Sequence, residues 1–207
     1  MTEQEIRKAC IAAKRPFAGR LRSTFVPPII NPSRIALVGE APGEEEELQE
    51  KPFVGQSGQI LDSALREAGI SLRTCYVTNL VKFRPCVDQE AYGEKQKGNR
   101  APTWEEILAF RPILVEELTD LAPKVIVTLG ASALKGLTGS ETKSISKCEG
   151  RVYEWSFREG PTYFLVPLYH PAYILRSGGV GSLGYNDYVQ SIKKTILRVL
   201  KGDYDDN

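Results

Sequence analysis

Four short apolar runs, each followed at once by glycine or polar residues, are the feature that most restricts the fold of this chain. They are residues 34–38 (RIALV), 75–78 (CYVT), 124–129 (KVIVTL) and 163–168 (YFLVPL). Nearly continuous apolar strands are typical of a parallel sheet that is covered on both faces. Stretches with helical periodicity separate them, as at 59–68 and 104–121. The sequence therefore predicts an α/β fold.

The carboxyl ends of these predicted strands are where a binding site is expected. In open α/β sheets, ligands bind at the carboxyl ends of the parallel strands. Glycine or polar residues follow all four runs, at Gly39, Asn79, Gly130 and Tyr169. We therefore expect the side chains after the four runs to share one edge of the sheet.

Length and composition are those of one ordinary globular domain. Of the 207 residues, 42% are hydrophobic and 26% charged, which argues against disorder and allows a substantial core. We expect a single domain over residues 1–207, with an irregular N-terminal segment (1–33) and an acidic tail (203–207). No apolar run approaches the ~20 residues of a membrane helix, and the charged, interrupted N-terminus does not resemble a signal peptide. We therefore expect an intracellular, cytoplasmic protein without membrane contact.

Charge and cysteine content do not identify a partner by themselves. The net charge is +1, which does not indicate a nucleic-acid-binding protein. The four cysteines are widely spaced without a CxxC pair, so free thiols are expected. A basic stretch fits either a DNA-facing surface or an ordinary solvated surface; its members are Lys82, Arg84, Lys95, Lys97 and Arg100.

Two glycine-containing loops follow the first predicted strand. In residues 39–43 (GEAPG), the glycines permit close backbone approach, and N–H groups there can hold a phosphate or a base oxygen; a plain turn is the alternative. In residues 52–58 (PFVGQSG), Phe53 is free to stack on a planar ring, and Ser57 at a helix start suits a phosphate. The alternatives are a core position for Phe53 and a helix N-cap for Ser57.

Asn79 and His170 end two of the other predicted strands. An amide presents a donor and an acceptor side by side, which matches the O4 and N3–H edge of uracil and mismatches the amino group of cytosine. Asn79 is equally compatible with an ordinary turn. His170, the single histidine, is held between a buried strand and Pro171; a catalytic and a structural role both remain open, and a histidine-rich metal site is excluded.

Together these motifs resemble the uracil-DNA glycosylase superfamily, and most closely its family-4 branch. The resemblance covers residues 34–177 in the order of the family. It is carried by the segments GEAPGEEEE, KPFVGQSGQILD, TNLVKFRP, NRAPTWEEI and YHPAYILR.

The resemblance implies a three-layer α/β/α sandwich with a central, mainly parallel four-stranded sheet. It also implies an enzyme of base excision repair that flips uracil out of DNA and hydrolyses the N-glycosidic bond, which leaves an abasic site. By motif, Phe53 is expected to stack on the flipped uracil, Asn79 to read its N3/O4 edge and His170 to donate toward O2. Ala41 and the neighbouring backbone, with Glu40, are expected to line the pocket.

The resemblance leaves the water-positioning group open. Some relatives carry a water-activating aspartate where this chain has Ala41, so Glu46 and Glu40 are the catalytic candidates beside His170, with Glu46 preferred. A wedge that fills the vacated base stack is expected just beyond His170. Its candidates are Tyr173, Ile174 and Arg176. The expected DNA contacts are Gly43, Ser57, Tyr173 and Arg176.

The chain departs from the family at its iron–sulfur cluster. The family-4 branch holds a [4Fe–4S] cluster on four cysteines, the first two as a C-x-x-C pair. Here Cys10 has Ala13 at that spacing, and the positions of the third and fourth ligands hold Phe83 and Phe110. Because a cluster requires thiolate ligands, we predict no cluster and no metal, and we expect Phe83 and Phe110 to pack together.

Three interpretations of the whole chain are open. The main one is a monofunctional, monomeric uracil-DNA glycosylase that acts on single- or double-stranded uracil-containing DNA. The second is a catalytically weak or inactive member that binds DNA or serves a replication partner. The third is a branch whose histidine captures the abasic sugar, but its basic, histidine-containing loop is not evident. The polar stretch 87–98 is either a tolerated insertion or a contact with DNA or a partner.

Overall fold

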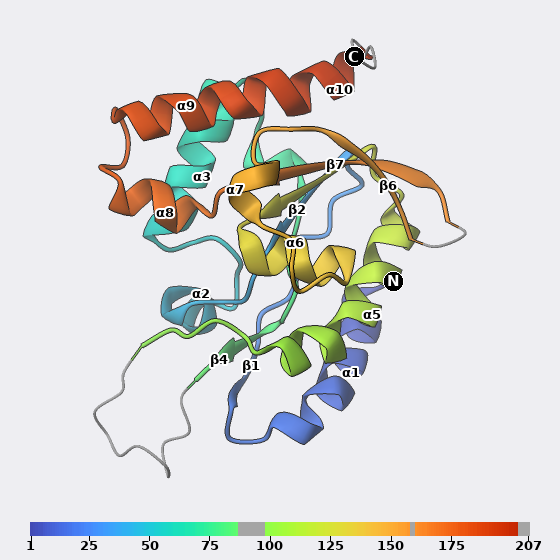
Figure 1. Ribbon diagram of the computed structural model, residues 1–207. Coiled ribbons are helices and arrows are strands. Elements are labelled where there is room, and N and C mark those ends of the chain that lie inside the picture. The colour runs from blue at the N-terminus through green and yellow to red at the C-terminus, as the bar shows by residue number, and fades with distance from the viewer. Residues whose placement is uncertain (87–97, 158–159, 203–207) are drawn as a thin grey trace.

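A five-stranded sheet forms the centre of the protein, which a computed structural model describes over residues 1–86, 98–157 and 160–202 (Figure 1). The strand order is β3-β2-β5-β7-β6. The first four of these are parallel neighbours and correspond to the four predicted strands: β2 (Ile35–Gly39), β3 (Tyr76–Asn79), β5 (Val125–Leu129) and β7 (Thr162–Leu168). The α/β class and the mainly parallel sheet are confirmed.

The prediction of a four-stranded sheet missed one edge strand. Strand β6 (Tyr153–Ser156) pairs antiparallel with β7, in the register Tyr153↔Leu165. Its residues alternate between half-buried and exposed. An edge strand that is covered on one face only lacks the continuous apolar run by which the other four were identified.

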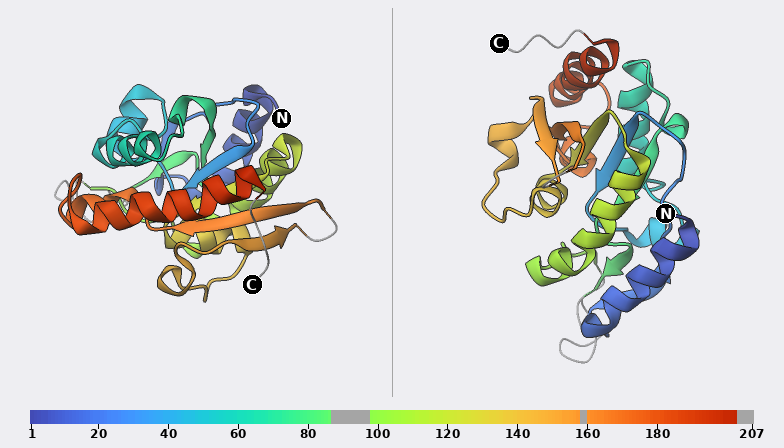
Figure 2. Two further views of the ribbon diagram at one scale, coloured as in Figure 1. Left: turned by 90° about the horizontal axis from the view of Figure 1, so that it is seen from above. Right: turned by 90° about the vertical axis from the view of Figure 1, so that its right-hand side faces the viewer.

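Helices cover both faces of the sheet, which gives the expected three layers (Figure 2). Alternate residues of β2 divide between the two cores, because successive side chains in a strand point to opposite faces: Ala36 and Val38 face one core, Ile35 and Leu37 the other. The first core is closed by α1 (Glu3–Lys14), α5 (Trp104–Leu121) and α6 (Ala131–Thr138). The second is closed by α3 (Gln56–Glu67), α8 (Pro171–Arg176) and α9 (Leu183–Ile192).

Helix α5 begins with a capping box formed by Thr103 and Glu106. Thr103 Oγ1 accepts from the N–H of Glu106 at 3.3 Å, and the Glu106 carboxylate accepts from the N–H of Thr103 at 2.8 Å. Such a cap contributes about 1 kcal/mol. Helix α5 continues through Pro112 without a break. Pro112 lies on the exposed side of α5, so the Leu108 carbonyl that loses its helical donor faces solvent.

The N-terminal segment contains more regular structure than expected. Besides α1 it contributes β1 (Leu21–Phe25), which pairs antiparallel with β4 (Phe83–Pro85) in a small separate sheet. The last helix, α9, begins at Leu183 and continues through a π-helical turn, η3 (Lys193–Leu197), into α10 (Arg198–Lys201). The remaining short elements are η1 (Arg15–Phe17), α2 (Glu44–Gln49), η2 (Leu72–Thr74) and α7 (Ile145–Cys148).

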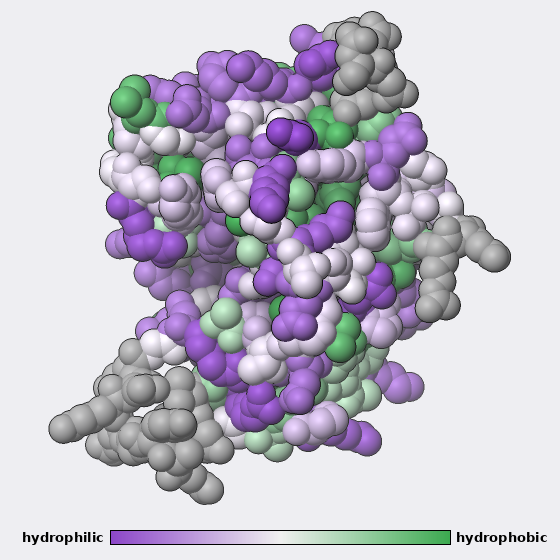
Figure 3. All heavy atoms as spheres, viewed as in Figure 1, coloured by the Kyte–Doolittle hydropathy of each residue, from purple (hydrophilic) through white to green (hydrophobic). Residues whose placement is uncertain are grey.

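The surface and the helices agree with a compact α/β protein. On the face seen in Figure 3, hydrophobic residues occur only as small separate patches among hydrophilic ones. Within the described ranges, none of the helices combines the length and apolar character needed to cross a membrane. Residues 87–97, which belong to the polar stretch 87–98, lie outside the described residues, as does the acidic tail 203–207.

Candidate active site

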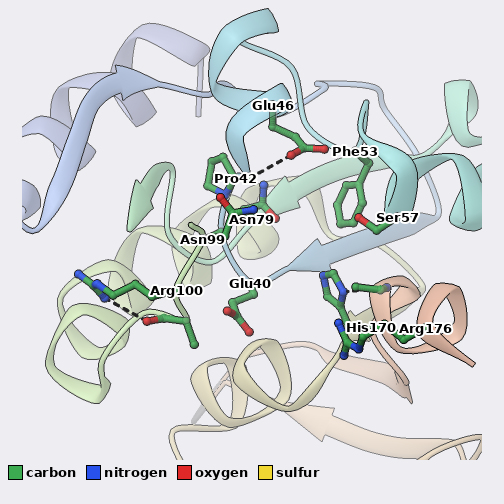
Figure 4. Close-up of a pocket in the computed structure, with 14 residues that line it drawn as sticks. Glu40, Pro42, Glu46, Phe53, Ser57, Asn79, Asn99, Arg100, His170 and Arg176 are labelled. Atoms are coloured by element: carbon green, nitrogen blue, oxygen red, sulfur yellow. Dashed lines mark hydrogen bonds between the residues drawn. The ribbon is translucent and has the colours of Figure 1, made fainter. Parts of the chain in front are cut away.

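A cavity of about 410 Å³ opens at the carboxyl ends of β2, β3 and β7, where the sequence predicted a site (Figure 4). Every predicted site residue except Tyr173 and Ile174 lines it. Five lining residues were not predicted: Pro42, Asn99, Arg100, Ala101 and Ala172. The complete lining is Glu40, Ala41, Pro42, Gly43, Glu46, Phe53, Ser57, Asn79, Asn99, Arg100, Ala101, His170, Ala172 and Arg176.

Phe53 and Asn79 meet over Gly39. Gly39 ends β2 and is paired in register with Asn79, which ends β3. A Cβ atom added to Gly39 would lie 2.2 Å from Asn79 Oδ1 and 2.6 Å from Phe53 Cζ, so only glycine lets both side chains approach this strand end. The Asn79 side chain is nearly buried, with 6% of the residue exposed. The ring and the amide thus share one side of the cavity.

Phe53 is held in a backbone conformation that side chains rarely adopt. Its φ is +54°, in the left-handed region that favours glycine. Gly58, in the first turn of α3, packs against the Phe53 carbonyl so closely that a Cβ there would lie 2.0 Å from its oxygen. The start of α3 therefore fixes the loop with the Phe53 ring in the cavity.

His170 is the N-cap of α8, and this fixes its tautomer. Its Nδ1 accepts from the N–H of Ala172 at 3.2 Å, so in the neutral ring the proton is on Nε2. Burial, and next the positive charge of Arg176, lower the pKa of His170 to about 4, while Glu46 opposes this shift. The imidazole is therefore neutral near pH 7, with one donor left for a ligand.

Glu46 connects the two loops that follow β2. Its Oε2 accepts from the N–H of Gly43 at 3.0 Å, and its Oε1 accepts from the N–H of Gly55 at 2.8 Å. Both oxygens are therefore engaged with backbone donors. This arrangement fixes the GEAPG loop relative to the loop that carries Phe53.

Glu40 has a different environment. It directly follows β2, and burial raises the pKa of its carboxyl, while a hydrogen bond from the Ser132 hydroxyl opposes the rise. In Figure 4 its carboxyl group lies below the central space of the cavity, toward α6. A carboxylate that is buried beside a cavity and tuned in this way is a candidate for acid–base chemistry.

The residues expected to contact DNA are distributed unequally. Gly43, Ser57 and Arg176 line the cavity. Ser57 is not the N-cap of α3; that position is Gly55, and Ser57 lies in the first turn. Tyr173 lies outside the cavity lining, about half exposed, with its ring 4.9 Å from that of Tyr169. Ile174 is 2% exposed and packs in the core, so its proposed role as a wedge was wrong.

Asn99 and Arg100 are the two of the five unpredicted cavity residues that carry polar side chains. Asn99 Oδ1 accepts from Arg84 Nε at 2.8 Å, which turns its NH₂ group away from Arg84. Arg100 is held by Glu106 through two hydrogen bonds of 2.7 and 2.8 Å. The sequence shows a stretch of basic residues, but it does not indicate which of them are buried or which residues they bind.

For Lys82 and Arg84, the first two residues of the basic stretch, both predicted surfaces, DNA-facing and solvated, were wrong. Lys82 and Arg84 are 1% and 7% exposed and form ion pairs with Glu117 and Glu47. They face neither DNA nor solvent. Residues 95 and 97 lie outside the described residues.

The residues present do not fit an iron–sulfur cluster. The rings of Phe83 and Phe110 pack edge to face, with centroids 6.0 Å apart, which confirms their predicted contact. Phe25 packs on Phe83 in the same way at 5.8 Å. Burial raises the pKa of Cys10 to about 12, which disfavours the thiolate that a cluster requires. In the described part of the chain, no group of three or more His, Cys, Asp or Glu residues could hold a metal ion.

Comparisons with known proteins show the family of the chain. The model of the uracil DNA glycosylase superfamily matches residues 27–192. The Type-4 uracil-DNA glycosylase of Thermotoga maritima is 38% identical over 145 residues, which are 70% of this chain and 68% of that protein. That of Sulfurisphaera tokodaii is 32% identical over 190 residues (89% and 81%), and that of Saccharolobus solfataricus 36% over 173 residues (82% and 70%). The chain belongs to the uracil-DNA glycosylase superfamily.

Proposed function

We propose that this chain is a uracil-DNA glycosylase that hydrolyses the N-glycosidic bond of deoxyuridine in DNA, the first step of base excision repair. The names of its relatives support this activity. The observation that carries the proposal is the convergence of Phe53, Asn79 and His170 on one cavity (Figure 4). We expect a monomer that accepts uracil in single- or double-stranded DNA.

Recognition of the base follows from the ring and the amide. A uracil flipped into the cavity stacks on Phe53 and places its O4 and N3–H against Asn79. Because the amide offers one donor and one acceptor, both are satisfied by uracil, whereas cytosine presents an amino group to the donor. A buried donor left without a partner costs about 1–3 kcal/mol, which disfavours cytosine.

Bond cleavage develops opposite charges on the base and the sugar. The electron pair of the C1′–N1 bond moves to the uracil ring, and the sugar acquires oxocarbenium character. His170 Nε2–H donates a hydrogen bond to O2 and stabilises the negative charge as it forms. Water then adds to C1′ and releases one proton, which leaves an abasic site and free uracil.

Glu40 is the carboxylate that we assign to this water. Glu46 was the preferred candidate from the sequence, but both of its oxygens accept backbone N–H groups. We therefore assign Glu46 to holding the two loops together. Glu40 orients the water, accepts its proton and offsets the positive charge on the sugar. Gly43, Ser57 and Arg176 remain our candidates for phosphate contacts, and Tyr173 for a contact outside the cavity.

Replacement of Glu40 with glutamine is expected to change the pH dependence of cleavage. The ionised form is the active one, so the rate falls as the pH drops through the pKa of Glu40, which burial raises above its ordinary value. His170, with a pKa of about 4, titrates at lower pH. Single-turnover rates measured against pH should show this acid limb in the wild type and lose it, with a lower plateau, in Glu40→Gln. An unchanged limb in Glu40→Gln would reject the assignment.

The activity itself is tested with uracil-containing oligonucleotides. Single-stranded and duplex substrates are incubated with the protein, and abasic sites are then cleaved with alkali. Strand cleavage that requires uracil is the expected result, and matched oligonucleotides that contain thymine or cytosine are the control. Absence of cleavage at every salt concentration would exclude the enzyme and leave a DNA-binding or replication-associated role.

We further infer that the fold and the activity do not depend on iron, because aromatic packing takes the place of ligation around Phe83. The expected result is a colourless purified protein with full specific activity after expression in iron-depleted medium and treatment with a chelator. Iron content and the absorption spectrum are the measurements. Stoichiometric iron, with activity lost on its removal, would contradict this prediction.

A further inference from the structure

Lys82 and Glu117 form an ion pair inside the protein, between the end of β3 and helix α5. Their side chains are 1% and 0% exposed. Lys82 Nζ lies against Glu117 Oε1 and also donates to the main-chain carbonyl of Asn79 at 2.8 Å. The other carboxylate oxygen, Oε2, accepts from Tyr76 OH at 2.9 Å and from Thr78 Oγ1 at 3.0 Å. Every one of these contacts is to residues 76–82.

A buried pair of this kind is a poor device for stability alone. Removing two charges from water is costly, and well-packed apolar residues of similar volume are often equally or more stabilising. Ile113, Leu114 and Leu118, which flank Glu117 on α5, are buried in the first core. A purely structural account therefore does not explain why charges occupy this position.

The contact with Asn79 supplies the explanation. Asn79 ends β3 beside the cavity, and the N–H groups of Leu80 and Val81, which follow it, donate to the carbonyls of Gly39 and Glu40 at 2.9 and 3.0 Å. These two bonds fix one side of this segment. Lys82 fixes the other side by holding the Asn79 carbonyl. The backbone at Asn79, and with it the direction of the amide, is set between them.

We propose that the Lys82–Glu117 ion pair positions Asn79 for reading uracil, with Glu117 holding the ammonium group and Lys82 holding the Asn79 carbonyl. Neither side chain lines the cavity, so both are positioning residues and act through Asn79. The inference rests on the proposed function and adds to it the part of the core that fixes base recognition.

The test uses two variants that separate positioning from stability. Lys82→Met removes the ammonium and leaves a buried carboxylate, which lowers both stability and activity. The double variant Lys82→Met/Glu117→Leu replaces the pair with apolar side chains and is expected to recover part of the melting temperature lost in Lys82→Met; recovery is incomplete because the Tyr76 and Thr78 hydroxyls lose their acceptor. It does not recover the hydrogen bond to Asn79, so its single-turnover rate should remain at least about tenfold below wild type, since misplaced reacting groups cost up to about 10²-fold.

Two further measurements identify Asn79 as the residue through which the pair acts. Combined with Asn79→Ala, the apolar pair should cause little additional loss, because residues that act through one another are not additive. Tyr76→Phe is the matched control: it removes a hydrogen bond from the same carboxylate but leaves the contact between Lys82 and Asn79. It should lower the melting temperature and retain the wild-type rate.

The outcomes separate this inference from the proposed function. A wild-type protein that does not cleave uracil-containing DNA removes both. An active wild type overturns the inference alone in either of two cases: the apolar double variant cleaves at the wild-type rate, or the apolar pair lowers the rate of Asn79→Ala by the same factor as that of the wild type.

Discussion

Replacing His170 with alanine is expected to slow the cleavage of uracil-containing DNA by about 10²–10³-fold, the usual cost of losing one hydrogen-bond donor to a developing oxyanion. The imidazole is neutral near pH 7, and its Nδ1 is occupied by the N–H of Ala172. Nε2–H is therefore the only donor of the ring. Single-turnover cleavage at saturating enzyme measures the effect on the chemical step directly.

His170 also caps α8, so its loss has a structural effect that requires a control. Serine is a good N-cap residue but does not reach the place of Nε2. His170→Ser should therefore keep the melting temperature near that of the wild type and still be as slow as His170→Ala. A serine variant with near-wild-type activity would show that His170 acts as a helix cap and not in catalysis.

Substitution of Gly39 by alanine is expected to cost about 10²-fold or more in cleavage rate, a loss typical of reacting groups displaced by about 1 Å. The new methyl group would lie 2.2 Å from Asn79 Oδ1 and 2.6 Å from Phe53 Cζ. Both side chains must move away, into the space that the base requires. Steady-state and single-turnover rates, with binding of abasic product DNA, would show whether the damage is confined to the base pocket.

Gly184→Ala is the matched control for this change. Gly184 lies in the first turn of α9, and a Cβ there would meet only Ser177 Cβ, at an ordinary 3.8 Å. Because alanine favours helix over glycine, this variant should be as active as wild type and slightly more stable. Wild-type activity in Gly39→Ala would show that Phe53 and Asn79 do not need their observed positions.

The sequence predicted those elements whose local pattern of apolar residues indicates which of their faces are buried. The central strands are apolar throughout because helices cover both of their faces, so their positions and the residues at their ends could be identified. Strand β6 has no such run, since only one of its faces is covered. Helix α1 buries few apolar residues, Ile6 and Cys10 among them, and was not recognised within the N-terminal segment.

The same distinction explains what was missed in the site. Phe53, Asn79 and His170 stand at strand ends or in a glycine-rich loop and could be selected from the chain itself. The direction of Asn99 depends on Arg84, and that of Arg100 on Glu106. The choice between Glu40 and Glu46 depends on which backbone donors lie nearby. A local sequence pattern does not indicate hydrogen-bond partners that lie far apart in the chain and meet only when it folds.

The left-handed backbone at Phe53 has a consequence for engineering this protein. A non-glycine residue in that region costs roughly 1–2 kcal/mol, and glycine would adopt it without strain. Glycine would also remove the ring, which packs against the second core, and losing a packed aromatic side chain costs more than the strain that glycine relieves. Packing and base recognition therefore keep phenylalanine here in spite of the strained backbone, and a stabilised variant must gain its stability elsewhere.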